Sequence, residues 1–102
     1  MQIVVIHEGA LTGANAVDGL PATPWGGPIV GIVEALQDTT IDLVIAGHTH
    51  RAANTVIGGI PVVEGFNAGI SYSVAQLMIE GSDVAWAGTA TRVAKNLSLI
   101  HI

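Results

Sequence analysis

Two short apolar runs mark the strands of a buried sheet, and each run ends at histidine. Residues 3–6 (Ile-Val-Val-Ile) and 43–46 (Leu-Val-Ile-Ala) show no polar alternation, which is typical of strands covered on both faces. His7 follows the first run directly, and Gly-His-Thr-His follows the second at residues 47–50. Polar side chains are therefore expected at the carboxyl ends of two strands.

A short amphipathic helix is predicted between these strands, over residues 28–38. Apolar residues recur there at the helical spacing i, i+3, i+4, i+7, and Pro28 suits the first helical turn. A strand, loop, helix and strand in this order join two parallel strands. The carboxyl ends of parallel strands share one sheet edge, so His7 should lie near His48 and His50, where open α/β sheets bind ligands.

Residues 10–28 are rich in Gly, Ala, Asn and Pro without a sustained period, which predicts a long loop. Trp25 in this loop either stacks on a ligand or, in the interpretation we favour, covers the edge of the core. At the other end of the predicted helix, Asp38 and Asp42 are expected at the opposite edge of the sheet, away from the histidines.

Antiparallel structure is predicted for the remainder of the chain. Residues 54–63 read as a hairpin whose turn is Gly58-Gly59, since two glycines supply the positive φ angles of a two-residue turn. Pro61 implies an edge or early-strand position. Residues 72–80 and 84–91 are further strand candidates. The fold class is α/β, with a mixed sheet and one β-loop-α-β crossover followed by antiparallel hairpins.

The loop after the first hairpin contains Asn67, a weak candidate for substrate binding. This asparagine either orients a ligand or simply forms a turn, and the turn is the interpretation we favour.

The composition of the chain limits which partners and metal ligands are expected. The 102 residues carry three Lys plus Arg against eight Asp plus Glu, a formal net charge of -5, so no nucleic-acid partner is expected. There is no cysteine, so a metal would have to bind His, Asp, Glu or backbone oxygen. The apolar runs are far shorter than the roughly 20 residues needed to span a bilayer, and we expect no membrane segment.

Three blocks of the sequence resemble the calcineurin-like metallophosphoesterase domain of bacterial 5'-nucleotidases. They are Val-Ile-His-Glu-Gly at residues 5–9, Val-Ile-Ala-Gly-His-Thr-His-Arg at 44–51, and Ile-Pro-Val-Val-Glu-Gly-Phe-Asn-Ala-Gly at 60–69. The blocks occur in the family's order, and the resemblance covers roughly residues 3 to 95. It implies part of a four-layer α/β/β/α sandwich.

The resemblance also implies a chemistry. Members of this family bind two divalent metal ions, with zinc, manganese or iron suited to imidazole ligands. His7 and His48 would be ligands of one metal, and His50 a ligand of the other. The family hydrolyses phosphate monoesters, often nucleotides, by attack of a metal-activated water. It is commonly secreted or held at the cell surface.

Several parts of the family pattern are missing from the sequence. There is no Asp-x-His block, no metal-bridging aspartate, and no Asn-His block with its catalytic histidine, so no catalytic residue is expected in this chain. We interpret residues 1–95 as part of the catalytic domain of a longer enzyme, with little activity alone and the remainder of that domain as its partner. Residues 96–102 form a suspect tail, and His101 within it is discounted.

Two other interpretations stay open at this point. In the first, His7, His48 and His50 form one three-histidine site of a non-catalytic metal-binding module. Glu8 and Glu64 are then the only carboxylates expected at that edge. In the second, the chain is an inert structural fragment whose histidines bind nothing.

Overall fold

The structure is a computed structural model that describes residues 1–15, 21–81 and 83–93 of the chain. The suspect tail, residues 96–102, lies outside the described residues. The elements are β1 (Ile3–Val5), β2 (Thr12–Ala14), β3 (Thr23–Gly26), α1 (Pro28–Glu34), β4 (Leu43–Ala46), β5 (Ala52–Ile57), β6 (Ile60–Gly65), β7 (Ser71–Glu80) and β8 (Asp83–Val93).

A four-stranded mixed sheet in the order β1-β4-β6-β5 forms the centre of the fold. β1 pairs with β4 in parallel, with Val4 opposite Val44, and β4 pairs in parallel with β6. β5 runs antiparallel to β6 and closes the sheet on that side. The predicted crossover from β1 through α1 to β4 is therefore confirmed, and the carboxyl ends of β1, β4 and β6 share one edge.

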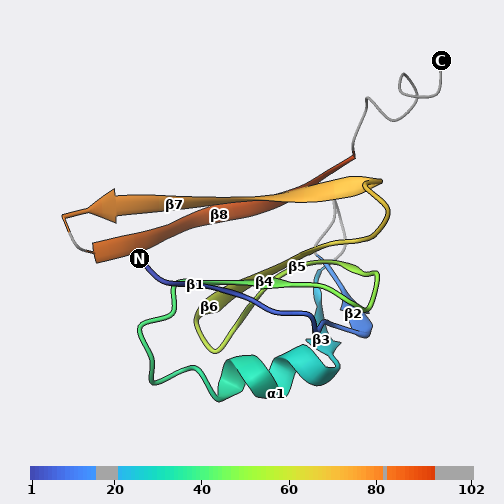
Figure 1. The fold of residues 1–102 in the computed structure, drawn as a ribbon, viewed down its shortest axis with the longest axis horizontal. Helices are drawn as coiled ribbons and strands as arrows, with labels where there is room; N and C mark the ends of the chain where they lie inside the picture. The colour runs from blue at the N-terminus through green and yellow to red at the C-terminus, as the bar shows by residue number, and fades with distance from the viewer. Residues whose placement is uncertain (16–20, 82, 94–102) are drawn as a thin grey trace.

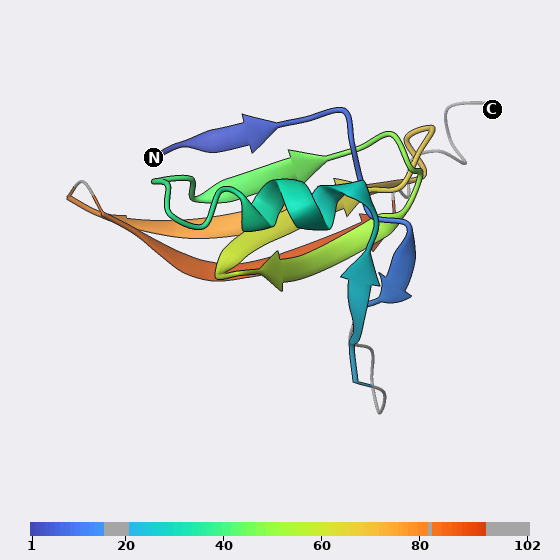
Figure 2. The ribbon, with the colours of Figure 1, turned by 90° about the horizontal axis from the view of Figure 1, so that it is seen from below.

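The elements form three layers (Figure 1). The helix α1 lies on one face of the sheet, and the long antiparallel hairpin of β7 and β8 lies over the other face. Seen from the helix side, α1 lies over the sheet roughly along the direction of its strands, and the β2–β3 pair projects from one end of the sheet (Figure 2). The chain is thus a mixed α/β fold with antiparallel hairpins, and the described residues contain one helix.

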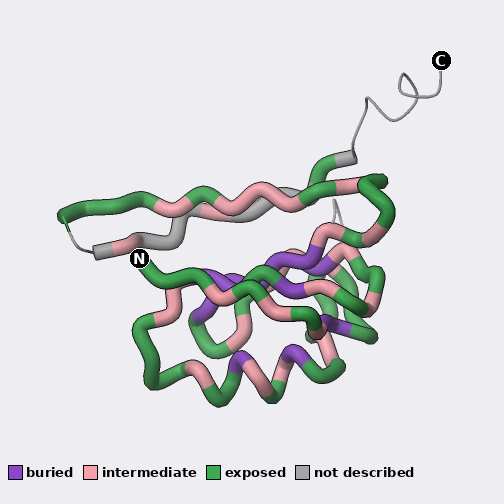
Figure 3. Tube along the Cα trace, in the orientation of Figure 1, coloured by how far each residue is buried: buried purple, intermediate pink, exposed green. Residues whose placement is uncertain are grey.

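The core lies between α1 and the sheet. Ile29 and Val33 of the helix and Val44 and Val62 of the central strands are at most 1% exposed. The buried positions gather between these elements (Figure 3). This burial follows from the helical spacing of the apolar residues on α1 and from the apolar runs of the central strands. The prediction that the runs at residues 3–6 and 43–46 are covered on both faces is wrong in part, because Val5 is 75% exposed and Ile45 is 37% exposed.

The helix is shorter than the sequence predicts, since α1 ends at Glu34 and not at residue 38. After Glu34 the backbone tightens: the amide of Leu36 donates to the carbonyl of Val33, and that of Gln37 donates to that of Glu34. These are i to i−3 hydrogen bonds, which often terminate a helix in a narrower turn. Leu36 still packs against the core from this turn.

The prediction that residues 10–28 form a loop is wrong in part, because β2 and β3 pair there as a short antiparallel ribbon. Asn15 fixes this ribbon to β5: its Nδ2 donates to the Ala52 carbonyl at 2.7 Å, and its Oδ1 accepts from the Asn54 amide at 2.9 Å. The Trp25 indole also donates to Asn15 Oδ1, at 3.2 Å, and the ring packs against the core. Trp25 therefore covers the core edge, as we favoured.

The glycine turn of the first hairpin is confirmed. Gly58 and Gly59 join β5 to β6 with φ angles of 55° and 83°, which glycine adopts at little steric cost. Pro61 is the second residue of β6 and precedes the pairing of β6 with β4, which begins at Val62. The early-strand position predicted for this proline is therefore correct, although β6 is an interior strand.

Candidate functional site

The two strand-end histidines meet at the carboxyl edge of the sheet. His7 Nε2 and His48 Nδ1 are 2.8 Å apart, and the ring centroids are 4.5 Å apart with an interplanar angle of 60°. One ring nitrogen donates and the other accepts in this contact, according to the tautomers. Both residues are exposed, so their free ring atoms are open to a ligand.

The parallel pairing of β1 and β4 brings these histidines together. Beyond the paired residues, the amide of Ile6 donates to the Ile45 carbonyl at 2.9 Å. The amide of Gly47 donates back to the Glu8 carbonyl, also at 2.9 Å. Each histidine is therefore adjacent to a residue whose backbone is hydrogen-bonded between the two strands. These bonds fix the positions of the His7 and His48 Cα atoms relative to each other.

The turn that carries the second and third histidines has an unusual backbone. His48 and His50 have φ angles of 77° and 56°. These angles lie in the left-handed region, which residues other than glycine adopt at an energetic cost. The amide of Thr49 between them donates to the Gly47 carbonyl at 2.9 Å. Such a conformation persists only where surrounding contacts hold it.

Glu64 is hydrogen-bonded to this turn. It is 1% exposed, and its carboxylate faces the histidine turn from β6. Oε2 accepts from the Thr49 hydroxyl at 2.7 Å and from the Arg51 amide at 3.2 Å, while Oε1 accepts from the Ala10 amide at 3.0 Å. Glu64 lies at the edge expected from the sequence, but its oxygens are already bonded within the protein, so it is not a free metal ligand.

The sequence does contain a signal for this role of Glu64. It is the one charged residue in the run Ile60–Gly65, which is otherwise apolar apart from glycine. A carboxylate in a buried strand requires several donors around it. The donors come from residues 10, 49 and 51, and only the assembled fold brings these to β6.

The histidine pair provides two of the ligands that a metal needs. Two imidazole nitrogens on one tetrahedral zinc lie about 3.3 Å apart, so His7 and His48 would have to separate by about 0.5 Å, which exposed rings can do. Among the described residues, no three His, Asp or Glu side chains are arranged to hold a metal ion. His50 does not complete such a group, and its role as a ligand of a second metal stays a prediction.

Asn67 occupies a turn. The Ile70 amide donates to the Asn67 carbonyl at 3.1 Å, and the residues between them, Ala68 and Gly69, have φ angles of 54° and 70°. This geometry is that of a two-residue turn joined by an i to i+3 hydrogen bond. The turn-forming interpretation of Asn67 is the one that these contacts support.

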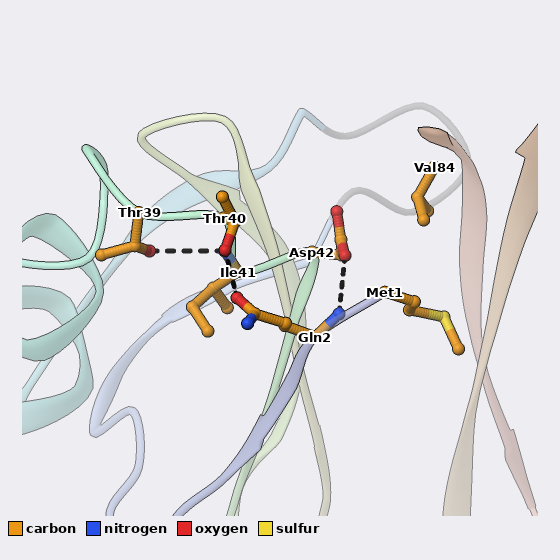
Figure 4. A pocket seen from close by; sticks show the side chains of 7 residues that line it. All are labelled: Met1, Gln2, Thr39, Thr40, Ile41, Asp42 and Val84. Carbon is orange, nitrogen blue, oxygen red and sulfur yellow. Dashed lines mark hydrogen bonds between the residues drawn. The ribbon is translucent and has the colours of Figure 1, made fainter. Parts of the chain in front are cut away.

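A polar pocket of about 610 Å³ lies at the opposite edge of the sheet, where β1 and β4 begin (Figure 4). Asp42 Oδ2 accepts from the Gln2 amide at 2.8 Å, and the Thr40 hydroxyl donates to the Gln2 side chain. The polar groups that line this pocket thus bond to one another and tie the starts of the two strands together. Asp42 lies away from the histidines, as expected.

The comparisons with known proteins leave the family open. No family model matches the chain, and neither a curated protein nor a solved structure matches it. In the part of the chain that the structure describes, no helix combines the length and apolar character needed to cross a membrane.

Proposed function

We propose that this chain carries metal-binding histidines of a two-metal phosphoesterase that resembles 5'-nucleotidases and hydrolyses nucleotides or related phosphate monoesters. One observation carries the proposal: His7 and His48, 41 residues apart in sequence, meet with ring nitrogens 2.8 Å apart at the edge where α/β sheets bind ligands. The order of the three sequence blocks supports the same reading.

The layer arrangement is compatible with the proposed family. A helix packs on one face of the mixed sheet, and an antiparallel hairpin lies over the other face, where it contacts β5 and β6. We propose that these layers form part of a four-layer α/β/β/α sandwich. The ligands absent from this sequence, including the Asp-x-His and Asn-His blocks, would then come from the remainder of that domain.

The histidines present would divide between two metals. His7 through Nε2 and His48 through Nδ1 would hold one divalent ion, and His50 would serve the second. When bound, such ions activate water and neutralise charge on the phosphoryl oxygens. The contribution of this chain is to fix the two imidazoles on adjacent parallel strands and to shape the turn that carries His48 and His50.

Metal titration of the chain tests the first part of the proposal. We expect Zn²⁺ to shift the ring proton resonances of His7 and His48 together in NMR spectra. His7→Ala and His48→Ala should each weaken zinc binding about tenfold or more, because a single imidazole is a poor site. In the two-metal arrangement, His50→Ala should change the zinc affinity of the pair much less. If His50→Ala is as damaging as His48→Ala, the three-histidine module is the better account.

The enzymatic part of the proposal is tested on a protein that contains the missing blocks. We would recover the adjoining coding sequence, express the protein that contains the missing blocks, load it with Zn²⁺ or Mn²⁺, and measure phosphate release from nucleoside monophosphates and a model phosphoester. We expect the wild-type protein to release phosphate and the His48→Ala variant to release none. A folded, metal-loaded protein that releases no phosphate from any of these substrates would rule out the enzymatic proposal.

A further inference from the structure

The geometry assigns to Glu64 the role of a positioning residue that holds the turn of His48 and His50 in its ligand-binding shape. The inference rests on the proposed function only where it concerns metal affinity. Its structural part concerns contacts of the metal-free chain and can be tested separately.

Glu64 connects three segments that approach the site from different parts of the sequence. Its carboxylate accepts from the Thr49 hydroxyl at 2.7 Å and from the Arg51 amide at 3.2 Å, so it bonds on both sides of His50. It also accepts from the Ala10 amide at 3.0 Å, just beyond the strand that delivers His7. A single buried side chain thus fixes both histidine-bearing segments.

The histidine turn needs such a support. Both histidines in it have positive φ angles, and their side chains are exposed, so burial of the rings does not hold the backbone in place. The bonded atoms, Thr49 Oγ1 and the Arg51 amide, belong to the residues that alternate with the histidines. Since charge-assisted hydrogen bonds are the strong ones, a carboxylate is well suited to this function.

The buried position of Glu64 also indicates that it orients the metal ligands and is not a metal ligand itself. Glu64 is 1% exposed and its carboxylate accepts three hydrogen bonds, whereas His7 and His48 are exposed. A residue of this kind acts on a metal through the ligands that it orients. Outer-shell partners of metal ligands typically change metal affinity by about 10- to 100-fold when they are replaced.

Amide hydrogen exchange tests the structural part without a metal. The amides of Ala10 and Arg51 lie outside the strands, yet both donate to Glu64. We expect both to be protected in the wild-type chain. Glu64→Gln keeps one acceptor oxygen, so at least one of the two amides should exchange about tenfold faster. Glu34→Gln, which removes an exposed carboxylate on α1, is the matched control and should change neither amide.

Variants of Thr49 keep the test decisive if Glu64→Gln fails to fold. Thr49→Val removes the hydroxyl with little change in volume, and Thr49→Ser retains it. We expect Thr49→Val to shift the His48 and His50 ring resonances and to weaken Zn²⁺ binding about tenfold, and we expect Thr49→Ser to restore both. A role in stability alone would not produce this rescue in a folded protein.

The outcomes separate the two proposals. If the wild type binds Zn²⁺ through His7 and His48 and the folded Glu64→Gln protein binds it about tenfold more weakly, positioning is supported. If the folded variant binds equally well with unchanged Ala10 and Arg51 exchange, positioning is overturned. If the wild type binds no Zn²⁺, the metal site of the proposed function fails, and exchange and ring resonances still decide the role of Glu64.

Discussion

Replacing Gly9 with alanine tests how tightly the histidine edge is packed. Gly9 is buried where the chain leaves β1, and a Cβ atom there would collide with the Thr49 hydroxyl, the Glu64 carboxylate and the Gly47 carbonyl. Two of these groups are bonded to each other, and the third is backbone. None of them can move away without breaking a contact of the site.

The expected cost follows from these contacts. Overpacking of a tight interior costs about 1–3 kcal/mol, and displacing the carboxylate from the Ala10 amide costs about 1–3 kcal/mol more. We expect Gly9→Ala to lower the free energy of unfolding by roughly 3 kcal/mol. In a domain of this size, that loss lowers Tm by about 12 to 24 °C.

Gly31 provides the matched control, because it is exposed on α1 and an added Cβ would meet nothing within 4 Å. Gly31→Ala should stabilise the chain by about 0.5–1 kcal/mol, since alanine loses less backbone entropy in a helix. Circular dichroism melts and urea unfolding of both variants give the comparison. A Gly9→Ala protein that melts with the wild type, or a Gly31→Ala protein that loses as much as Gly9→Ala, would refute the reasoning.

Two further predictions concern the edges of the fold. Asn15→Ala removes two hydrogen bonds that join the β2–β3 ribbon to β5 and one that joins Asn15 to Trp25 within the ribbon. It should cost about 1–3 kcal/mol in urea unfolding, and a loss below about 0.5 kcal/mol would show that the ribbon is not anchored there. Val5 is 75% exposed on the edge strand β1, and exposed apolar edge strands favour pairing between copies of a chain. We therefore expect the chain to self-associate in sedimentation experiments, and Val5→Lys to reduce this association while changing stability by less than about 0.5 kcal/mol. Unchanged association would show that the edge strand β1 is not the surface through which copies associate.

The sheet was predictable because its signals are strong and local. The strand runs at residues 3–6 and 43–46 lack polar residues, and the Gly58-Gly59 pair can adopt the positive φ angles of a two-residue turn at little steric cost. The β2–β3 ribbon was not predictable in this way. Its Thr, Gly, Pro and Trp residues show no alternation, and contacts from Asn15 to a distant strand hold it in place.

The candidate site also has one part that the sequence predicts and one part that it does not. The meeting of His7 and His48 followed from a topological rule, since parallel strands bring their carboxyl ends to one edge whatever the side chains are. The role of Glu64 did not follow, because its three donors lie 13 to 54 residues away in sequence. A rule of topology can bring two strand ends together, but it does not show which buried side chain then fixes the turn between them. That step depends on atomic contacts, and for this reason the Glu64 and Thr49 variants are the sharper test of the site.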